Sequence, residues 1–224
     1  MRADLRYVSV NAEVFGDGDI PVLFLHGNGE SSKIFSNIAK YLPERYKAFC
    51  PDTRGHGKST YAPLSYDYFA DDVKEFIEKT GLRAPVVVGF SDGGITALKV
   101  MVKYPGTISR AVLCGANFAP DGLKKSAVRL FKMQYFLFRS ERVRLMLEEP
   151  VFEEKDLEKI DVPVLILAGE RDLVRREHTE RLHSLIKGSE LKIIPGEGHS
   201  GYVRDNGKLF SEIKDFIGRQ ADMG

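Results

Sequence analysis

The sequence of 224 residues lacks several features that would direct it to particular partners. Its 33 Lys and Arg are balanced by 32 Asp and Glu, so the net charge of +1 provides no basic excess for capturing nucleic acid or an anionic membrane. No apolar run approaches the roughly 18 residues that cross a bilayer. Tryptophan is absent, which excludes any site built on an indole. We therefore expect neither nucleic acid nor a membrane as a partner.

Cysteine is also scarce, and Cys50 and Cys114 each lie in or at the end of an apolar segment. Thiols in such segments are more often buried side chains than halves of a disulfide. The first six residues lack the apolar stretch of a secretory signal, so we expect a cytoplasmic location. Neither His-Glu-x-x-His nor Cys-x-x-Cys spacing occurs, and we expect no metal and no organic cofactor.

Apolar runs and helical stripes alternate along the chain. Short continuous runs rich in β-branched residues occupy 22–25, 47–50, 86–88, 111–114, 164–167 and 191–194. Continuous apolar character is typical of parallel strands buried on both faces. Apolar residues at helical spacing occur at 66–79, 93–103 and 207–217. This alternation predicts βαβ units in an open α/β sheet, with residues 6–15 as an antiparallel strand at its edge.

The stretch 117–161 breaks this alternation. It holds an aromatic and basic run at 130–138, followed by a charged segment at 142–149. One interpretation is two helices forming a small lid, inserted between the core segments 1–116 and 162–224. The other is an amphipathic helix pair packed on the sheet. The aromatic side chains would either line a pocket or seal the lid onto the sheet, and these are Phe131, Tyr135, Phe136 and Phe138. The basic side chains are expected to form a solvated face, and these are Lys124, Lys125, Arg129 and Lys132.

A candidate nucleophile follows the apolar run 86–88. The chain continues as Gly89-Phe90-Ser91-Asp92-Gly93, a Gly-x-Ser-x-Gly pattern, and a helix comes next. A sharp strand-to-helix turn lifts the serine hydroxyl clear of the sheet, and small flanking residues relieve crowding there. The helix N-terminus that follows favours developing negative charge. A phosphate-binding loop would require Gly-x-x-x-x-Gly-Lys-Ser/Thr, which is missing, so Ser91 is the expected nucleophile.

A serine nucleophile needs a base and a carboxylate that orients the base. His199 follows the strand at 191–194, and Asp172 follows the strand at 164–167, with Glu170 as a second choice. Sites in open α/β sheets assemble at these carboxyl ends of strands. The other histidines fit less well. Two adjoin glycines near strand ends, His26 and His56, and two lie on a charged helix where they look solvated, His178 and His183.

The order Ser91, Asp172, His199 resembles that of α/β-hydrolase-fold serine hydrolases. The resemblance spans nearly the whole chain, through 26–29, 52–59, 89–94, 169–172 and 198–199. More narrowly, 89–98, 103–105 and 115–117 are similar to the valacyclovir hydrolase (biphenyl hydrolase-like) branch, although the lid is shorter here. The resemblance implies an α/β-hydrolase fold, a mostly parallel doubly wound sheet with a small helical lid. It also implies a preference for α-amino-acid esters.

The expected activity is hydrolysis of small carboxylic esters through an acyl-enzyme on Ser91. The oxyanion would be held by the backbone N–H groups of Asn28 and Asp92. The Asp92 carboxylate is either stabilised by the dipole of the helix that follows or binds a substrate ammonium group. His26 and the loop from Asp52 to Ser59 are expected to brace the site by hydrogen bonds. C–C bond hydrolases and thioesterases share these residues, and a ligand receptor with little turnover is a further alternative.

Overall fold

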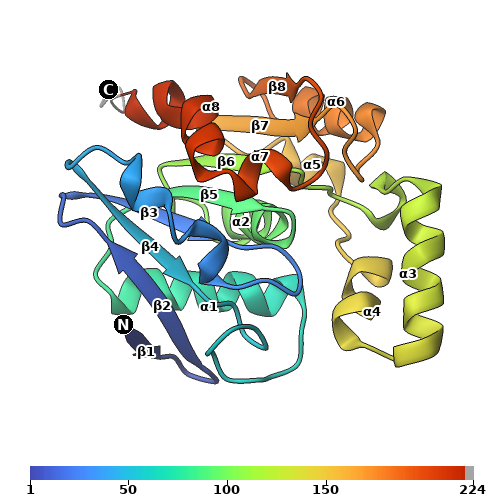
Figure 1. The fold of residues 1–224 in the computed structure, drawn as a ribbon, viewed down its shortest axis with the longest axis horizontal. Coiled ribbons are helices and arrows are strands. Elements are labelled where there is room, and N and C mark those ends of the chain that lie inside the picture. Colours follow the sequence, from blue (N-terminus) through green and yellow to red (C-terminus); the bar gives the residue numbers. More distant parts are fainter. Residues whose placement is uncertain (220–224) are drawn as a thin grey trace.

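The computed structural model describes residues 1–219, and their strands form one eight-stranded sheet in the order β1-β2-β4-β3-β5-β6-β7-β8 (Figure 1). The strands are β1 (Arg2–Asp4), β2 (Ser9–Phe15), β3 (Ile20–Leu25), β4 (Tyr46–Pro51), β5 (Val86–Phe90), β6 (Arg110–Cys114), β7 (Val164–Gly169) and β8 (Glu190–Ile194). From β4 to β8 all neighbours pair in parallel, whereas β1 and β2 are antiparallel. The predicted mostly parallel sheet is confirmed.

The strand expected at the edge of the sheet, β2, lies one strand in from the edge. β2 pairs with β4 on one side, and the short strand β1 covers its other side. The prediction that residues 6–15 form the edge is therefore wrong in this detail. Three residues are too few to show an alternating pattern, so β1 carried no signal in the sequence.

Helices cover both faces of the sheet. One core layer joins the sheet to α1 (Tyr66–Lys79), α2 (Asp92–Lys103) and α6 (Arg176–Leu185). The opposite layer joins it to the short turns η1 (Ser32–Phe35) and η2 (Ile38–Lys40), to α7 (Gly201–Arg204) and to α8 (Asn206–Gly218). Cys50 and Cys114 are free and buried in the second layer, as expected. The sheet is therefore doubly wound.

The segment between β6 and β7 holds more elements than the two expected helices. It contains η3 (Pro120–Gly122), α3 (Lys125–Phe138), α4 (Glu141–Glu148) and α5 (Glu154–Leu157). α3 and α4 pack together beyond the carboxyl ends of the strands (Figure 1). Ala127 is the buried residue of α3, and Leu145 is that of α4.

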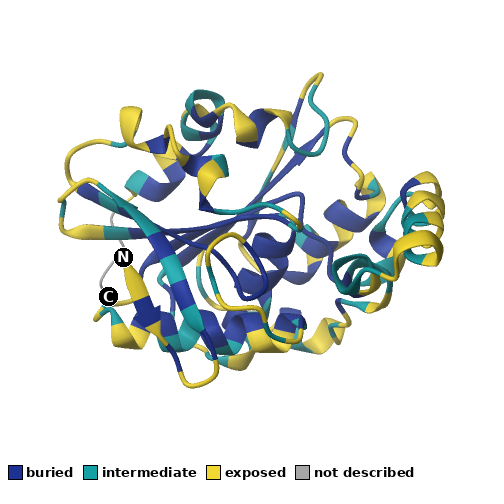
Figure 2. Cartoon of the chain, turned by 60° about the horizontal axis from the view of Figure 1, so that its bottom comes forward, coloured by how far each residue is buried: buried dark blue, intermediate teal, exposed yellow. Residues whose placement is uncertain are grey.

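The outer side of α3 is open to solvent (Figure 2). Phe136 is 73% exposed and Phe138 is 74% exposed, so these two rings neither line a pocket nor seal the lid onto the sheet. Both interpretations of these rings are therefore wrong. Phe131 and Tyr135 differ, because they lie on the half-buried side of the helix. A run of aromatic residues does not reveal which of them face outward.

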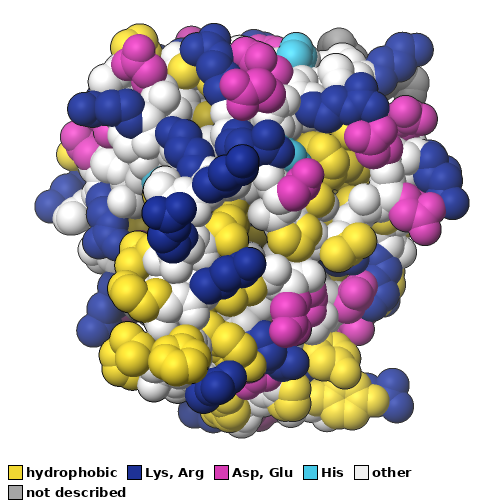
Figure 3. All heavy atoms as spheres, turned by 90° about the vertical axis from the view of Figure 1, so that its right-hand side faces the viewer, with side chains coloured by type: hydrophobic (Ala, Val, Ile, Leu, Met, Phe, Trp, Pro, Cys, Tyr) yellow, Lys and Arg dark blue, Asp and Glu magenta, His cyan; other side chains and the backbone are white. Residues whose placement is uncertain are grey.

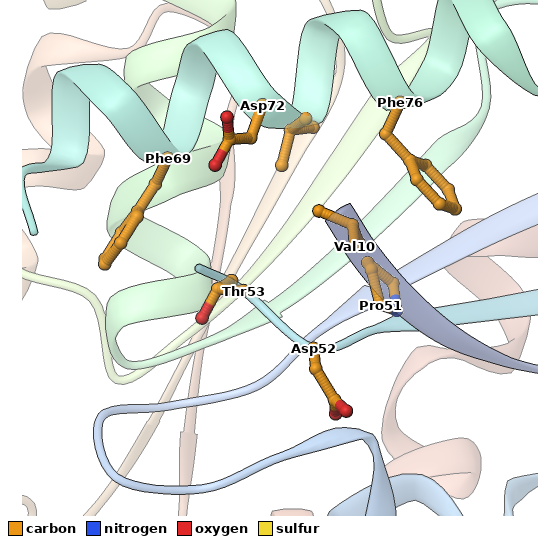
Figure 4. A pocket seen from close by; sticks show the side chains of 8 residues that line it. Val10, Pro51, Asp52, Thr53, Phe69, Asp72 and Phe76 are labelled. Carbon is orange, nitrogen blue, oxygen red and sulfur yellow. The ribbon is translucent and has the colours of Figure 1, made fainter. Parts of the chain in front are cut away.

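A small cavity lies between α1 and the strands β2 and β4 (Figure 4). Its volume of about 10 Å³ is close to that of one water-sized probe. Asp52 and Asp72 are among its lining residues, and the carboxylates of both accept hydrogen bonds from other residues. We therefore assign this cavity to packing.

Candidate active site

Ser91 occupies a strained turn between β5 and α2. Its φ of 51° and ψ of −114° lie where side-chain-bearing residues are rare, at a cost of about 1–3 kcal/mol. The Ser91 N–H donates to the carbonyl oxygen of Cys114 at 2.7 Å, which fixes the turn against β6. Gly93 must be glycine, because a Cβ there would overlap the backbone carbonyl of Leu25. The local strain and close packing aim the Ser91 hydroxyl away from the sheet.

Three side chains predicted from separate strand ends lie in one hydrogen-bonded series. Ser91 Oγ is 3.1 Å from His199 Nε2, and His199 Nδ1 is 2.6 Å from Asp172 Oδ1. With the imidazole proton on Nδ1, the ring donates to Asp172 and accepts from the Ser91 hydroxyl. Glu170 instead accepts a backbone hydrogen bond from Gly196 and takes no part in this series.

The surroundings of Asp172 favour its ionised form. Burial opposes ionisation, but hydrogen bonds from His199 and from the backbone N–H groups of Val174 and Gly169 outweigh it, and the pKa lies below its usual value. The two backbone bonds measure 3.1 and 3.2 Å. A carboxylate held in this way keeps the His199 ring oriented and would stabilise an imidazolium.

Two backbone donors adjoin Ser91. Asp92 is the first residue of α2, where an N–H has no acceptor within the helix. Among residues 1–219, neither its N–H nor that of Asn28 has a hydrogen-bond partner. Free N–H groups at a helix N-terminus and on a neighbouring loop can bind a developing oxyanion.

The side chain of Asp92 is held in a buried network. It is 5% exposed, accepts from Asn28 Nδ2 at 2.9 Å, and accepts from the Tyr66 hydroxyl at 2.9 Å. Burial raises the pKa of Asp92 from 3.8 to about 6, while the two hydrogen bonds oppose the rise. Asn28 also donates to the Arg142 carbonyl at 3.2 Å, so the network joins the loop that carries Asn28 to α4.

His26 and His56 brace the loop that carries Asn28, as expected. His26 Nε2 accepts from the Thr53 N–H at 3.0 Å, and its Nδ1 is 2.8 Å from the Gly27 carbonyl. His56 Nε2 accepts from the Gly29 N–H at 3.1 Å. Burial is the main reason that the pKa of each ring is lowered, to about 4 for His26. Neutral rings are required here, because each Nε2 acts as an acceptor.

Asp52 ties the neighbouring loops together, again as expected. Its carboxylate accepts from the N–H groups of Ser32 at 2.7 Å and Lys58 at 2.8 Å. Arg54 has a different role, because it forms two 2.6 Å hydrogen bonds with buried Asp72 on α1. Arg54 therefore stabilises the fold through Asp72 and is not available to bind a ligand.

The prediction that His178 and His183 are exposed to solvent is wrong. His178 is buried, stacks on Phe118 with ring centroids 4.0 Å apart, and accepts from the Phe118 N–H at 3.1 Å. Burial lowers its pKa to about 4. His183 is half-buried, and its Nδ1 is 2.8 Å from Ser189 Oγ. The charged neighbours in sequence lie on the other side of α6 and concealed this burial.

The pocket at Ser91 and His199 is small, at about 40 Å³. Phe131 lines it too, in agreement with one of the two interpretations of that ring, and so do Tyr66, Met146 and Glu149, which sequence reasoning did not assign to the site. Glu149 accepts from the Tyr66 N–H at 3.0 Å, which joins the end of α4 to the start of α1. These residues come from three separate helices or their ends, and no local motif marks them.

Within residues 1–219, no helix is both long and apolar enough to cross a membrane. The same residues contain no group of three or more His, Cys, Asp and Glu side chains arranged to bind a metal ion.

The fold agrees with comparisons to known proteins. A family model described as the alpha/beta hydrolase fold matches residues 20–143, more than half of the chain, and the chain belongs to that family. The human serine hydrolase BPHL is 28% identical, over 94% of this chain and 83% of that protein. The bifunctional esterase/perhydrolase DCH of Acinetobacter calcoaceticus is 29% identical, over 91% of this chain and 94% of that protein.

A solved structure supports the fold. The esterase EaEST from Exiguobacterium antarcticum superimposes with a TM-score of 0.80 at 23% identity, covering 95% of this chain and 96% of that one. Together, the family match and these relatives make the chain an enzyme of the α/β-hydrolase class, with esterases among its homologues.

Proposed function

We propose that the chain is a serine hydrolase that cleaves carboxylic esters of small molecules. The observation that carries the proposal is the series from Ser91 Oγ through the His199 ring to Asp172, with spacings of 3.1 and 2.6 Å. A hydroxyl is a weak nucleophile until an adjacent base can take its proton. The esterase among the relatives favours an ester as the substrate.

In the proposed reaction, His199 Nε2 takes the Ser91 proton as Oγ attacks the ester carbonyl carbon. The tetrahedral intermediate expels the alcohol, which receives that proton from His199, and an acyl-enzyme remains on Ser91. Water then attacks the acyl carbon while His199 removes its proton. Collapse of the second intermediate returns the proton to Ser91 and releases the acid. Asp172 keeps the ring in the required tautomer throughout.

The oxyanion in both intermediates would accept from the N–H groups of Asn28 and Asp92. Both donors lack other partners among residues 1–219, and the α2 dipole adds to their effect. Loss of one such donor costs roughly two to three orders of magnitude in rate. The donors are backbone groups, so Asn28→Ala tests the Asp92 network rather than the oxyanion hole itself.

We propose that the Asp92 side chain also binds the ammonium group of α-amino-acid esters. Asp92 lines the pocket, and each carboxylate oxygen has a lone pair left after its bond to Asn28 or Tyr66. Helix stabilisation alone is the competing explanation for a carboxylate at this position. Asp92→Ala should raise KM for an α-amino ester far more than for its des-amino analogue. Equal losses on both substrates would leave only the structural role.

The similarity to BPHL supports placing the chain in that branch, with residues 117–161 as a shortened lid and 1–116 with 162–224 as the core. Phe131 and Met146 from this segment line the pocket, which is consistent with a lid. We propose that the enzyme works in the cytoplasm on a small-molecule ester, with no nucleic acid or membrane partner. The reaction as written requires no cofactor.

A hydrolysis panel tests the function. It compares p-nitrophenyl acyl esters, α-amino-acid esters, the matching amides and a thioester, using wild type, Ser91→Ala and the exposed control Ser211→Ala. We expect ester turnover and fluorophosphonate labelling in wild type and the control, with both lost in Ser91→Ala. Turnover that survives in Ser91→Ala would contradict the assigned nucleophile. Faster cleavage of the thioester than of the esters would indicate that the enzyme is a thioesterase.

A further inference from the structure

A groove next to the catalytic pocket takes no part in the mechanism above. It has a volume of about 550 Å³ and lies between α3 and the loop before α6. Four cationic side chains line it, Lys125, Arg129, Lys132 and Arg175, against one carboxylate, that of Asp121. We call it the basic groove. The face of the molecule that carries α3 shows Lys and Arg side chains close together (Figure 3).

Three of the four cations of the basic groove have no partner within the residues that the structure describes. Lys125, Arg129 and Lys132 stand at i, i+4 and i+7, on one side of α3 where like charges repel. Among residues 1–219 these three side chains have neither an ion pair nor a hydrogen bond. Elsewhere, exposed arginines such as Arg176 and Arg181 pair with glutamates.

The nearest acids do little to offset this charge. Residues 122–140 contain no Asp or Glu. The carboxylate of Asp121 lies 3.8 Å from the Arg175 guanidinium, and its side chain is 80% exposed, so solvent screens the pair. Arg175 also donates through Nε to the Asp121 carbonyl at 3.0 Å, which fixes that arginine at the groove wall. An anion that enters the groove would therefore lie near four cations, three of them without a partner in the described residues.

The basic groove shares a wall with the catalytic pocket. Leu123 lines both spaces, and it pairs as a β-bridge with Val174, which also lines the catalytic pocket. The Lys124 N–H donates to the Leu173 carbonyl at 2.9 Å, and the Arg175 N–H donates to the Gly122 carbonyl at 2.8 Å, so hydrogen bonds join the two segments of this wall. The catalytic pocket holds only about 40 Å³, and any substrate larger than its reacting group must extend into adjoining space.

We infer that the basic groove is a subsite for an anionic group, a carboxylate or a phosphate, at the end of the substrate remote from the scissile ester. The inference rests on the proposed function and adds a substrate class to it. Asp92 and Glu149 line the catalytic pocket, so the two spaces have opposite charge. A substrate with an anionic tail would be drawn to the groove and repelled from the pocket, which orients its ester toward Ser91.

A series of paired substrates tests the subsite. p-Nitrophenyl half-esters of dicarboxylic acids of increasing length are compared with p-nitrophenyl esters of fatty acids of equal length, and a third series ends in phosphate. An exposed cation contributes roughly 1.5- to 5-fold in binding. With four cations, we expect the anionic tail to lower KM by about 10- to 100-fold at one tail length, an advantage that shrinks in high salt. The two anionic series separate carboxylate from phosphate.

Charge reversal assigns the effect to the groove. The variant K125E/R129E/K132E should lose the preference for anionic tails while its turnover of neutral esters is unchanged. The matched control K40E/K187E/K214E makes the same change of net charge at exposed lysines that do not line the groove, and it should keep the preference. Equal loss in both triple variants, or no preference in wild type, overturns the inference.

Failure of the proposed function gives a different result. If wild type hydrolyses neither series, the esterase proposal fails, and the groove is judged by calorimetry with suberate and with inorganic phosphate. Binding to wild type and to the control but not to K125E/R129E/K132E supports the subsite. Absence of binding to all three proteins overturns it.

Discussion

Asp92 is a buried carboxylate, and the isosteric change Asp92→Asn tests how burial of its charge affects the free energy of unfolding. Asp92 is 5% exposed and accepts one hydrogen bond from Asn28 and one from Tyr66. In the variant, the new amide oxygen can accept from Asn28, and the new NH₂ can donate to Tyr66 once its hydroxyl rotates. Both contacts persist, so the substitution removes the charge with little other change.

Burial raises the pKa of Asp92 from 3.8 to about 6. A carboxyl whose pKa is higher in the folded state stabilises the fold below the unfolded pKa, and that contribution is lost as pH rises through the folded pKa. A difference of about two pKa units corresponds to about 3 kcal/mol. The free energy of unfolding of the variant, minus that of wild type, should therefore rise by about 3 kcal/mol as pH increases from below 3.8 to above 6.

Urea unfolding followed by circular dichroism across this pH range measures the difference. Asp161→Asn is the matched control, since Asp161 is exposed, and its difference from wild type should stay level. A level difference for Asp92→Asn as well would refute the reasoning, because it would mean that burial does not penalise the charge of Asp92. Subtracting the unfolding free energy of wild type from that of the variant cancels the contributions of other groups that titrate in the same pH range, so the remainder reports on Asp92.

Further predictions concern strain, orientation, acid stability and the outer face of α3. Ser91→Gly removes a Cβ held at a φ of 51°, so urea melts should show about 1 kcal/mol more stability while ester hydrolysis is lost. Unchanged or lower stability would argue against strain at the turn. Asp172→Asn should lower kcat by about 10⁴-fold through loss of the tautomer, and a loss below tenfold would contradict its role. The pKa of His178 falls from 6.5 to about 4 on folding, so stability present above 6.5 is lost as pH falls toward 4. His178→Gln should remove about 3 kcal/mol of that acid dependence in urea melts, and an unaltered pH profile would count against a buried neutral ring. Phe136→Ser with Phe138→Ser should change unfolding free energy by less than about 0.5 kcal/mol and leave kcat intact, whereas a large loss would mean that the rings pack.

Local sequence patterns predicted the strands and the helices of the core closely. Apolar runs at 86–88 and 164–167 lie within β5 and β7, and the stripe at 66–79 coincides with α1. These elements are buried on one or both faces, so burial imposes a period on their own residues. β1 had too few residues for such a period, and it was missed.

The candidate catalytic residues were also predicted, because each follows a strand. Parallel strands end at one edge of the sheet, so Ser91, Asp172 and His199 come together although they are far apart in sequence. Tyr66 and Glu149 could not be found in this way. Their contacts depend on how α1 and α4 pack, which no motif encodes.

The sequence by itself determined the alternation of strands and helices in the core, the sharp turn at Ser91 and the near-neutral charge of the whole chain, because all three depend on local pattern or composition. Only the tertiary structure decided which charges meet. A chain with a net charge of +1 brings Lys125, Arg129, Lys132 and Arg175 around one groove and buries Asp92 in the pocket beside it. The physical reason is that electrostatic energy depends on distance and burial, and both are set by packing between distant segments.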